Sequence, residues 1–523
     1  MLKQNKTLIF IILLFLILNN FHHLFGFLQA NKNKNLIYDI VNPLNVADYN
    51  VYLSMIEQGR EGHLFTKLLY NHTATNNPLF SPHWYIIGQS ANILNISTPM
   101  SYFLFRILLS IIFILLIWYL IKKIFFTKKD ATMALVVVLF SNGLGMTLYP
   151  FFKNTNINPI NLDLTDGISF LSMYTSPIFI LSQILIISIF LFFIKGTLTK
   201  KKYFILCAAI LNLLLVLIHP YDTITIVFVL TAWSLIKYYK EKRKIIFIYL
   251  LSIYISSVLG STYHIWWLIN DHVMSQWNSQ NILTSGPLMD YIVGLGLISV
   301  LSFFGIIYIC KKKIFTNDYL NLMVVWAILG WLLIYLPINF NRRLVNGWHV
   351  PLAITTAITL SLILKNKLTF RKYLLLFLIF LLLSADTSLF ININYFKPKE
   401  YLFFHTRERQ NIYDYIKNNS SEDDVIMARQ IDANYLPAFT ARKVYTGHPI
   451  GTWQDEKKSN EIKKIWSQKN DISDWLINNN IKFIFASKKY LNEFNQIKWL
   501  AQEKYIKVIV DDKDFVLYEV ITF

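Results

Sequence analysis

The sequence predicts a mainly α-helical protein that crosses a membrane about eleven times, followed by a small α/β domain at its C-terminal end. Apolar runs recur through the first three quarters of the chain, and each is long enough to cross about 30 Å of hydrocarbon as a helix. Only 15% of the residues are charged, whereas soluble domains carry about 25%. After residue 395, Asp and Glu return and short β-rich runs alternate with helical ones.

The apolar runs set the predicted spans. The first follows Lys3 and Lys6 and is too long for the apolar part of a signal peptide, so we expect it to be retained. The spans are expected at residues 7–27, 102–121, 131–150, 174–194, 203–219, 222–238, 245–265, 289–310, 318–338, 350–364 and 373–391.

The basic residues of the loops predict the orientation. Clusters of Lys and Arg fall in alternate loops, which lie on one side of the membrane if the spans number eleven. That side should be cytoplasmic, together with the N-terminus. The long polar loop 29–101 and everything after about residue 392 should then lie outside. The clusters are at residues 122–129, 195–202, 237–244, 311–313 and 365–372.

The C-terminal segment is predicted to be an α/β domain covering residues 396–523, with the membrane domain covering 1–395. We expect strands at 424–428, 482–486, 505–510 and 515–520, and helices at 400–417, 455–467 and 472–479. No glycine-rich phosphate loop precedes these helices, so the sequence gives no sign of nucleotide binding there.

The formal charge of +19 does not indicate a nucleic-acid partner. The basic residues lie in short loops between apolar runs and form no basic aromatic stripe. Cys207 and Cys310 lie in apolar runs and have neither disulfide nor metal-site spacing. Two glycosylation triplets in the first polar loop, at Asn71 and Asn95, are weak signals in a chain so rich in Asn.

The first polar loop contains the leading candidate for chemistry, Asp48. Helical spacing after it predicts an amphipathic helix at the membrane interface, with Asp48 at the N-terminal end, where the helix dipole favours a carboxylate. The alternative is that Asp48 only caps this helix. A second acidic pair, Asp163 and Asp166, falls in the next outer loop. These two carboxylates could act as a general base and its orienting partner, or could form a metal site. The alternative is that they belong to an ordinary solvated loop.

Further polar groups lie where spans meet the outer surface. Arg342 and Arg343 are on the side where topology does not require basic residues, and arginine binds phosphate through paired hydrogen bonds. Arg106 lies near the outer start of the second span. His219 and Asp222 bound a turn too short for an ordinary loop, and His349 follows the arginine pair. Ionisable groups at a membrane edge are functional candidates, although structural charges that reach toward water are common.

At these residues the chain resembles the GT-C superfamily of membrane glycosyltransferases, which includes the protein O-mannosyltransferases and the aminoarabinose transferase of lipid A. It is most similar to the bacterial set called glycosyltransferase family 39-like. The motifs that carry the resemblance are Asp48-Tyr49, Tyr52-Leu53-Ser54, Gln58-Gly59-Arg60-Glu61-Gly62-His63, Pro78-Leu79-Phe80, Gly88, His219-Pro220-Tyr221-Asp222, Arg342-Arg343 with Gly347, His349 and Pro351, and the stretch 440–449.

The resemblance implies an enzyme that transfers a sugar from a polyprenyl-phosphate donor to an extracytoplasmic lipid, glycan or protein. Asp48 would be the general base, and Asp163 or Asp166 would assist. Arg342 and Arg343 would hold the departing phosphate. Glu61, His63, Arg106, His219, Asp222 and His349 are further candidates for substrate binding. The second loop has no tight Asp-Glu pair, so metal use is left open, with a divalent metal as one option.

Two other functions stay open at the level of sequence. A transporter or lipid-carrier scaffold should show broken or charged spans and internal symmetry, which the sequence does not show clearly. A polysaccharide polymerase or ligase should have its main outer loop late in the chain, whereas the long loop here comes first.

Overall fold

The computed structural model describes residues 2–41, 44–73, 77–162, 164–314, 317–364, 375–376, 378–380, 383, 403–467, 471–488 and 498–521. The chain divides into two compact units. The first, called the helical unit, contains Met1–Phe25, Leu104–His264 and Leu283–Pro398. The second, called the mixed unit, contains Gly26–Phe103, Ile265–Ile282 and Lys399–Phe523. Helices α1, α4 and α11 begin in one unit and end in the other.

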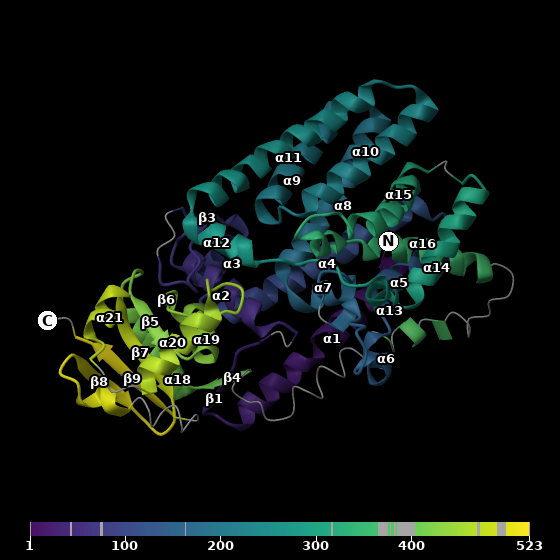
Figure 1. The fold of residues 1–523 in the computed structure, drawn as a ribbon. Coiled ribbons are helices and arrows are strands. Elements are labelled where there is room, and N and C mark those ends of the chain that lie inside the picture. The colour runs from purple at the N-terminus through teal and green to yellow at the C-terminus, as the bar shows by residue number, and fades with distance from the viewer. Residues whose placement is uncertain are drawn as a thin grey trace. The chain divides into compact units, whose positions relative to one another are not determined.

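The helical unit consists of apolar helices joined by short connections, and α8 to α11 run back and forth in succession (Figure 1). Polar side chains mark where several helices begin. Thr127 caps α5, and Asn317 caps α15 by accepting hydrogen bonds from two backbone N–H groups. The elements that lie wholly or partly in this unit are α1 (Leu2–Lys32), α4 (Thr98–Ile124), α5 (Lys128–Phe140), α6 (Gly145–Phe152), η1 (Ile160–Leu162), α7 (Ser169–Thr175), α8 (Pro177–Thr199), α9 (Lys202–Ile218), α10 (Asp222–Glu241), α11 (Ile245–Asn270), α13 (Leu288–Leu295), α14 (Leu297–Lys311), α15 (Asp318–Leu333), η2 (Asn341–Val345) and α16 (His349–Leu364).

Among the described residues, four helices are long and apolar enough to cross a membrane: α1 from Lys6 onward, α4, α8 and α11. Two bent helix pairs raise the number to six if each pair is one span. The chain is therefore a helical membrane protein, but the predicted count of eleven spans is not confirmed. Helices α9 and α15 are apolar but shorter, and most of the last predicted span, 373–391, lies outside the described residues.

Two of the predicted spans contain a break. Residues 131–150 form α5 and α6 at 43° to each other, and residues 289–310 form α13 and α14 at 93°. Gly296, between α13 and α14, has φ +58° and ψ −132°, a conformation that only glycine adopts readily. The two breaks are in contact, because the Leu144 N–H donates to the Val293 carbonyl at 3.0 Å. A Cβ atom on Gly143 would overlap the Gly294 carbonyl oxygen, so this contact also requires a residue without a side chain.

The mixed unit is built around a five-stranded sheet of order β6-β5-β7-β9-β8. β5 is parallel to β6 and β7, while β9 is antiparallel to β7 and β8. The unit's elements are β1 (Leu36–Tyr38), α2 (Val46–Arg60), β2 (Phe65–Thr66), β3 (Leu79–Phe80), α3 (Pro82–Ile93), α12 (His272–Gln280), β4 (Phe404–Thr406), α18 (Arg407–Asn418), β5 (Val425–Ala428), α19 (Gln430–Thr440), β6 (Lys443–Val444), α20 (Asp455–Ser467), α21 (Ser473–Asn478), β7 (Ile481–Ser487), η4 (Lys498–Gln502), β8 (Ile506–Asp511) and β9 (Phe515–Val520).

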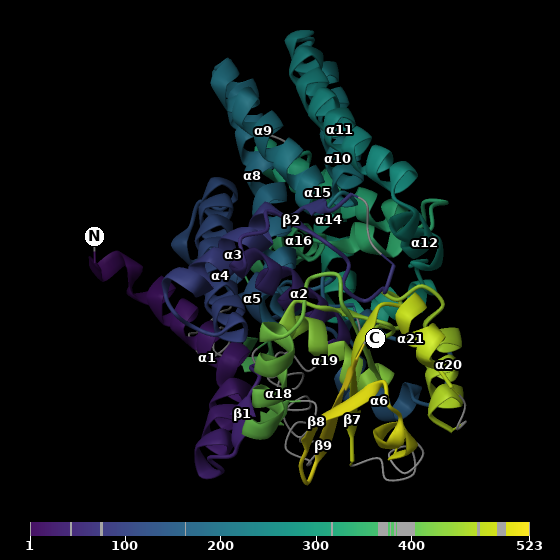
Figure 2. The ribbon, with the colours of Figure 1, turned by 90° about the vertical axis from the view of Figure 1, so that its left-hand side faces the viewer.

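Helices cover both faces of this sheet, as Figure 2 shows. On one face, α18 and α19 bury residues such as Ile412 and Leu436 against Phe483 and Phe485 of β7. On the other, α20, α21 and η4 bury residues such as Trp466 against Ile484. Because successive residues of a strand point to opposite faces, β7 contributes to both cores, which explains its buried apolar run Phe483–Ala486.

The strands of the sheet lie within a residue or two of the sequence predictions. β9 matches the predicted strand 515–520, and α20 matches the predicted helix 455–467. Helix α18 begins at Arg407, seven residues after the predicted start at residue 400. The short strand β6 and helix α19 were not predicted. The division at residue 395 stays a prediction, because the mixed unit contains residues 26–103 and 265–282 as well as the C-terminal segment.

Helix α2 packs against α3 and α19 within the mixed unit and buries eight of its 15 residues. The α2–α3 contact depends on two glycines. A Cβ atom on Gly59 would lie 2.8 Å from the Trp84 carbonyl oxygen, and one on Gly88 would lie 2.6 Å from the Gly59 carbonyl carbon. Both glycines therefore allow close backbone approach, which gives a structural reason for their presence in the motifs of the first polar loop.

We expect Gly88→Ala to destabilise the mixed unit by about 1–3 kcal/mol, because the new methyl group has to push α3 away from α2. Thermal unfolding of the purified protein in detergent measures this loss as a lower midpoint. Ser90→Ala on the same helix is the control, since the Ser90 hydroxyl bonds only to the Ile86 carbonyl one turn earlier. Equal unfolding midpoints for Gly88→Ala and Ser90→Ala would show that the close packing of α2 against α3 does not require a glycine at position 88.

Candidate functional site

Asp48 is the third residue of α2 and lies in its first turn, after the N-cap residue. The N-cap is Asn45, whose side-chain oxygen accepts the Asp48 N–H at 3.3 Å, so the alternative that Asp48 itself caps the helix is wrong. The Asn45 amide also donates to Asp48 Oδ2. The Asp48 side chain is 38% exposed, so one side of this carboxylate can be reached from outside the protein.

His448 holds the other carboxylate oxygen of Asp48. Its Nε2 lies 3.1 Å from Asp48 Oδ1. Its Nδ1 accepts the backbone N–H groups of Ile450 at 3.1 Å and Gly451 at 2.7 Å. Because these backbone groups can only donate, Nδ1 must be unprotonated and Nε2 must carry the proton. His448 is therefore fixed in the tautomer that donates to Asp48.

The loop that carries His448 is braced from the first polar loop. The Thr452 hydroxyl accepts the N–H groups of Gly447 and His448 and donates to the Tyr70 carbonyl at 2.8 Å. The Tyr70 hydroxyl donates to the Asn434 carbonyl, and burial raises its pKa well above the usual value. These buried hydrogen bonds set the position of His448 before any substrate is present.

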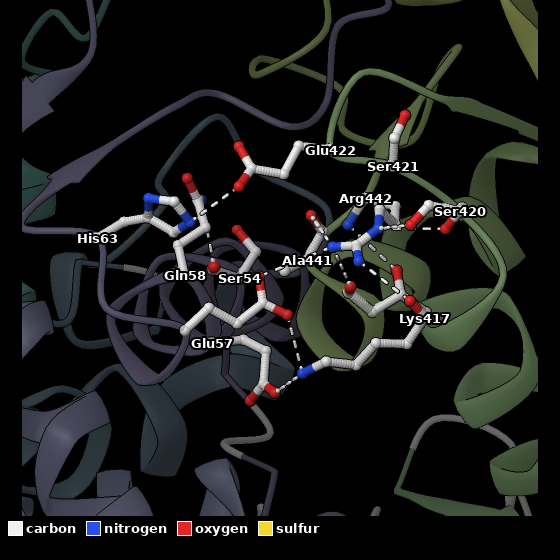
Figure 3. Close-up of polar contacts among 12 residues, drawn as sticks. Ser54, Glu57, Gln58, His63, Lys417, Ser420, Ser421, Glu422, Ala441 and Arg442 are labelled. Atoms are coloured by element: carbon white, nitrogen blue, oxygen red, sulfur yellow. Dashed lines mark hydrogen bonds and ion pairs between the residues drawn. The ribbon is translucent and has the colours of Figure 1, made fainter.

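Glu61 and His63 take part in a charge network that joins α2 to the C-terminal segment. Figure 3 shows the His63–Glu422 and Glu57–Lys417 contacts of this network. Lys417 pairs with Glu57 at 2.6 Å and with Glu61 at 3.0 Å, and the Arg442 guanidinium lies 3.7 Å from Glu61. His63 lies 3.0 Å from Glu422. The two carboxylates raise the pKa of Lys417, although burial opposes this. These partners favour a structural role for Glu61 and His63 over substrate binding.

A second polar cluster is buried in the helical unit. His219 Nδ1 lies 2.9 Å from Asp222 Oδ2, and the Asn346 amide donates to the same oxygen at 2.8 Å. Gln183 donates to the Asn346 side-chain oxygen at 3.0 Å and to the Ser172 hydroxyl at 2.8 Å. All five side chains are buried, and they join α7, α8 and α10 to the connection that follows η2.

Asp166 and Arg343 belong to the same neighbourhood. Burial raises the pKa of Asp166, while the charges of Arg343 and His219 oppose that increase. Asp166 Oδ2 is buried and accepts no hydrogen bond from any described residue. The Arg343 guanidinium lies over the Tyr221 ring, 5.9 Å from its centroid. The structure thus brings together Asp166, His219, Asp222 and Arg343; Arg342 precedes Arg343 on η2 and is partly buried.

Two other candidates have their hydrogen-bonding groups filled by neighbouring helices. Arg106 is buried in α4 and donates to the Met173 and Tyr174 carbonyls at 2.7 and 3.1 Å and to the Asn19 side chain at 3.0 Å. Its second nitrogen contacts Asn20 and His23. His349 lies between the hydroxyls of Ser141 and Ser169. This geometry favours a structural role for both residues.

The possible divalent metal stays a prediction. Across the part of the chain that the structure describes, no group of three or more His, Cys, Asp or Glu side chains could hold a metal ion. Asp163 lies outside the described residues, so its proposed role also stays a prediction.

Sequence reasoning missed the residues that support these candidates. Gln183, Asn346 and Ser172 are neutral and lie in apolar surroundings, so no sequence signal marked them. His448 did stand in the stretch 440–449 that carries the family resemblance, but its pairing with Asp48 connects residues 400 positions apart.

No protein-family model and no curated protein sequence matches this chain. Among solved structures, it matches the Archaeoglobus fulgidus oligosaccharyltransferase tethered with an acceptor peptide, with a TM-score of 0.50 at 11% identity over 91% of this chain and 70% of that one. The arabinofuranosyltransferase AftD from Mycobacteria matches with a TM-score of 0.50 at 11% identity, over 97% of this chain and 41% of that one.

ArnT from Cupriavidus metallidurans, bound to undecaprenyl phosphate, matches with a TM-score of 0.49 at 11% identity, over 90% of this chain and 92% of that one. At these identities the likeness concerns the fold alone. In its fold, this membrane protein resembles the GT-C glycosyltransferases, as its sequence motifs predicted.

Proposed function

We propose that this protein is a membrane glycosyltransferase that transfers a sugar from a polyprenyl-phosphate donor to a hydroxyl group of an extracytoplasmic lipid, glycan or protein. The observation that carries the proposal is the partly exposed carboxylate of Asp48, held by His448. The likeness in fold to two glycosyltransferases supports the same class of reaction. The basic loops support an outward-facing site, since they favour a cytoplasmic N-terminus.

In the proposed reaction, Asp48 accepts the proton of the acceptor hydroxyl while that oxygen attacks the anomeric carbon of the donor sugar. The bond from the anomeric carbon to the phosphate oxygen breaks, and its electron pair leaves with the polyprenyl phosphate. His448 is a positioning residue, because its fixed N–H holds one Asp48 oxygen and leaves the carboxylate oriented for proton transfer.

Arg342 and Arg343 are proposed to stabilise the phosphate as it gains charge, the point at which electrostatic stabilisation has its greatest effect on rate. Asp166 would act through Arg343, by holding the guanidinium in the buried cluster. The bonds among His219, Asp222 and Asn346 would fix the segment that follows η2. A donor phosphate placed near Arg343 would gain from the scarcity of water in this cluster.

Asp48→Asn tests the general base directly. The amide cannot accept the proton, so we expect transfer from a polyprenyl-phosphate sugar to fall by about 10²–10⁴-fold, while the unfolding midpoint stays unchanged. The control is Asp474→Asn, an exposed aspartate in the first turn of α21. Transfer at the wild-type rate by Asp48→Asn would reject Asp48 as the base.

His448→Leu should lower the rate and move the acidic limb of the pH–rate profile to higher pH. The hydrogen bond from His448 favours the ionised form of Asp48, so its loss raises the pKa of the carboxylate. His448→Gln, which can still donate, should restore part of the rate and move the limb back. A slower enzyme with an unshifted profile in both variants would show that His448 only supports the fold.

Arg343→Gln should reduce transfer by about 10²–10³-fold, the usual loss when one group that stabilises developing charge is removed. Inhibition by free polyprenyl phosphate should weaken in the same variant. Arg243→Gln, on an exposed loop of the same unit, is the matched control. If Arg343→Gln keeps its sensitivity to polyprenyl phosphate, the arginine does not hold the phosphate.

Transport is the second candidate function, and one observation favours it: the contacting breaks between α5 and α6 and between α13 and α14. Discontinuous helices often line substrate sites in transporters. Purified protein in vesicles separates the two functions. A transporter would move a labelled polyprenyl-phosphate sugar between leaflets without an acceptor, whereas a transferase would consume the donor only when an acceptor is present.

A further inference from the structure

The mixed unit has a polar pocket that the proposed reaction does not use. Its volume is about 280 Å³, near the roughly 300 Å³ lower end of small-molecule sites. It has room for one sugar-sized group, and it is more polar than an ordinary gap in a core. The lining includes His72 from the first polar loop, Gln276 of α12, Tyr445 and Trp453 from the loops around the sheet, and Lys457 and Lys458 of α20.

Lys458 is the unusual feature of this pocket. Its side chain is only 8% exposed, and its ammonium group lies over the Tyr445 ring, 5.4 Å from the centroid. Neither nearby carboxylate forms an ion pair with it: Glu461 accepts the Tyr445 hydroxyl at 2.6 Å, and Asp455 accepts Thr446 and Gln430. Burial lowers the pKa of Lys458 to about 8, so the group is still mainly protonated at neutral pH. Asp455 and Glu461, the latter also in the pocket lining, favour the charge of Lys458 without forming an ion pair with it, so they offset the cost of its burial only in part.

His72 adds a second polar group whose bonding is incomplete. Its Nδ1 is buried and has no hydrogen-bond partner among the described residues, and its ring lies 4.8 Å from that of Tyr445. Burial and the positive charges of Lys458 and Lys443 lower the pKa of His72 to about 4, so the ring is neutral. It can offer a donor or an acceptor to a ligand without adding charge.

The neighbouring loop fixes the backbone of Trp453, whose side chain lines the pocket. The Asn71 side chain donates to the Gly451 carbonyl at 2.8 Å and accepts the backbone N–H of Trp453 at 2.9 Å. Asn71 is thus a buried bracing residue, and its glycosylation triplet does not present an available amide. Trp453 follows by five positions the His448 that holds Asp48, so one short braced loop contributes to both the dyad and the pocket.

We propose that this pocket binds a saccharide that carries a carboxylate or phosphate group, with Lys458 pairing with the anion and Trp453 packing against the apolar face of the sugar ring. Naming this saccharide as part of the acceptor rests on the proposed function. Lysine and histidine supply the charge and the hydrogen bond that an anionic oxygen requires, and the indole supplies the flat apolar surface that a free inorganic anion would not need.

Ligand-observed saturation-transfer NMR on the purified full-length protein in detergent tests the binding. The probes are glucuronate, glucose 6-phosphate and glucose, and the binding of inorganic phosphate, which has no carbon-bound proton, is measured by its competition with glucose 6-phosphate. We expect glucuronate or glucose 6-phosphate to bind, and the comparison of the two shows which anion is preferred. Lys458→Met and Trp453→Ala should each weaken binding at least 10-fold, while Lys464→Met, on an exposed position of α20, should not.

Stability gives a second readout. Lys458→Met removes a costly buried charge, so its unfolding midpoint should equal or exceed that of the wild-type protein, whereas a purely structural lysine would give a lower one. Absence of binding by both anionic sugars, or equal binding by Lys458→Met, overturns the proposal. Equal binding of phosphate and glucose 6-phosphate overturns its saccharide part.

The result is independent of the transfer reaction. If an anionic sugar binds but no transfer to any acceptor is found, the proposed transferase function is refuted and the proposed saccharide binding stands. If transfer is found but neither anionic sugar binds, the saccharide binding is refuted and the transferase function stands.

Discussion

The mixed unit depends on contacts between the first polar loop and a segment that follows it by several hundred residues. β1 pairs with β4, Asp39 lies 2.5 Å from His405, and Asp48 meets His448 across 400 positions of sequence. Closing so long a loop costs entropy, although the cost grows only slowly with length. Burial of Asp39 and His405 opposes their separation, because each would leave an unsatisfied polar atom if its partner moved away.

Local structure could be predicted from the sequence because it is encoded locally. Short β-rich runs placed β5, β7, β8 and β9 within two residues, and long uncharged runs located the membrane helices. Helix breaks were missed, since the predicted spans 131–150 and 289–310 run through Gly143 and Gly296. The first break had a local signal, because Asn142-Gly143 is a turn dipeptide. The contact of Gly143 with the Gly294 carbonyl has no signature within a short window of sequence.

The candidate site was predictable in part, residue by residue. Asp48 could be identified because a carboxylate near the start of a helix is a recognisable local feature. Arg343 could be identified because it falls on the predicted outer side, where membrane topology does not require basic residues. The pairing of Asp48 with His448, and of Asn346 with Asp222, required knowledge of which distant segments meet. Arg106 and Arg343 cannot be told apart from the sequence. In the structure, Arg106 donates to backbone and side-chain groups of neighbouring helices, whereas the charge of Arg343 acts on the buried carboxylate of Asp166.

That contrast gives a physical criterion for separating structural from functional charges in this chain. A buried charge whose hydrogen-bonding capacity is filled by fixed protein groups, such as Arg106, holds helices together and has little left to offer a ligand. A buried charge such as Lys458, which lines a pocket and forms no ion pair with any residue that the structure describes, lowers stability unless a ligand neutralises it. Since ordinary packing could replace it with an apolar residue, its presence is better explained by what the pocket binds.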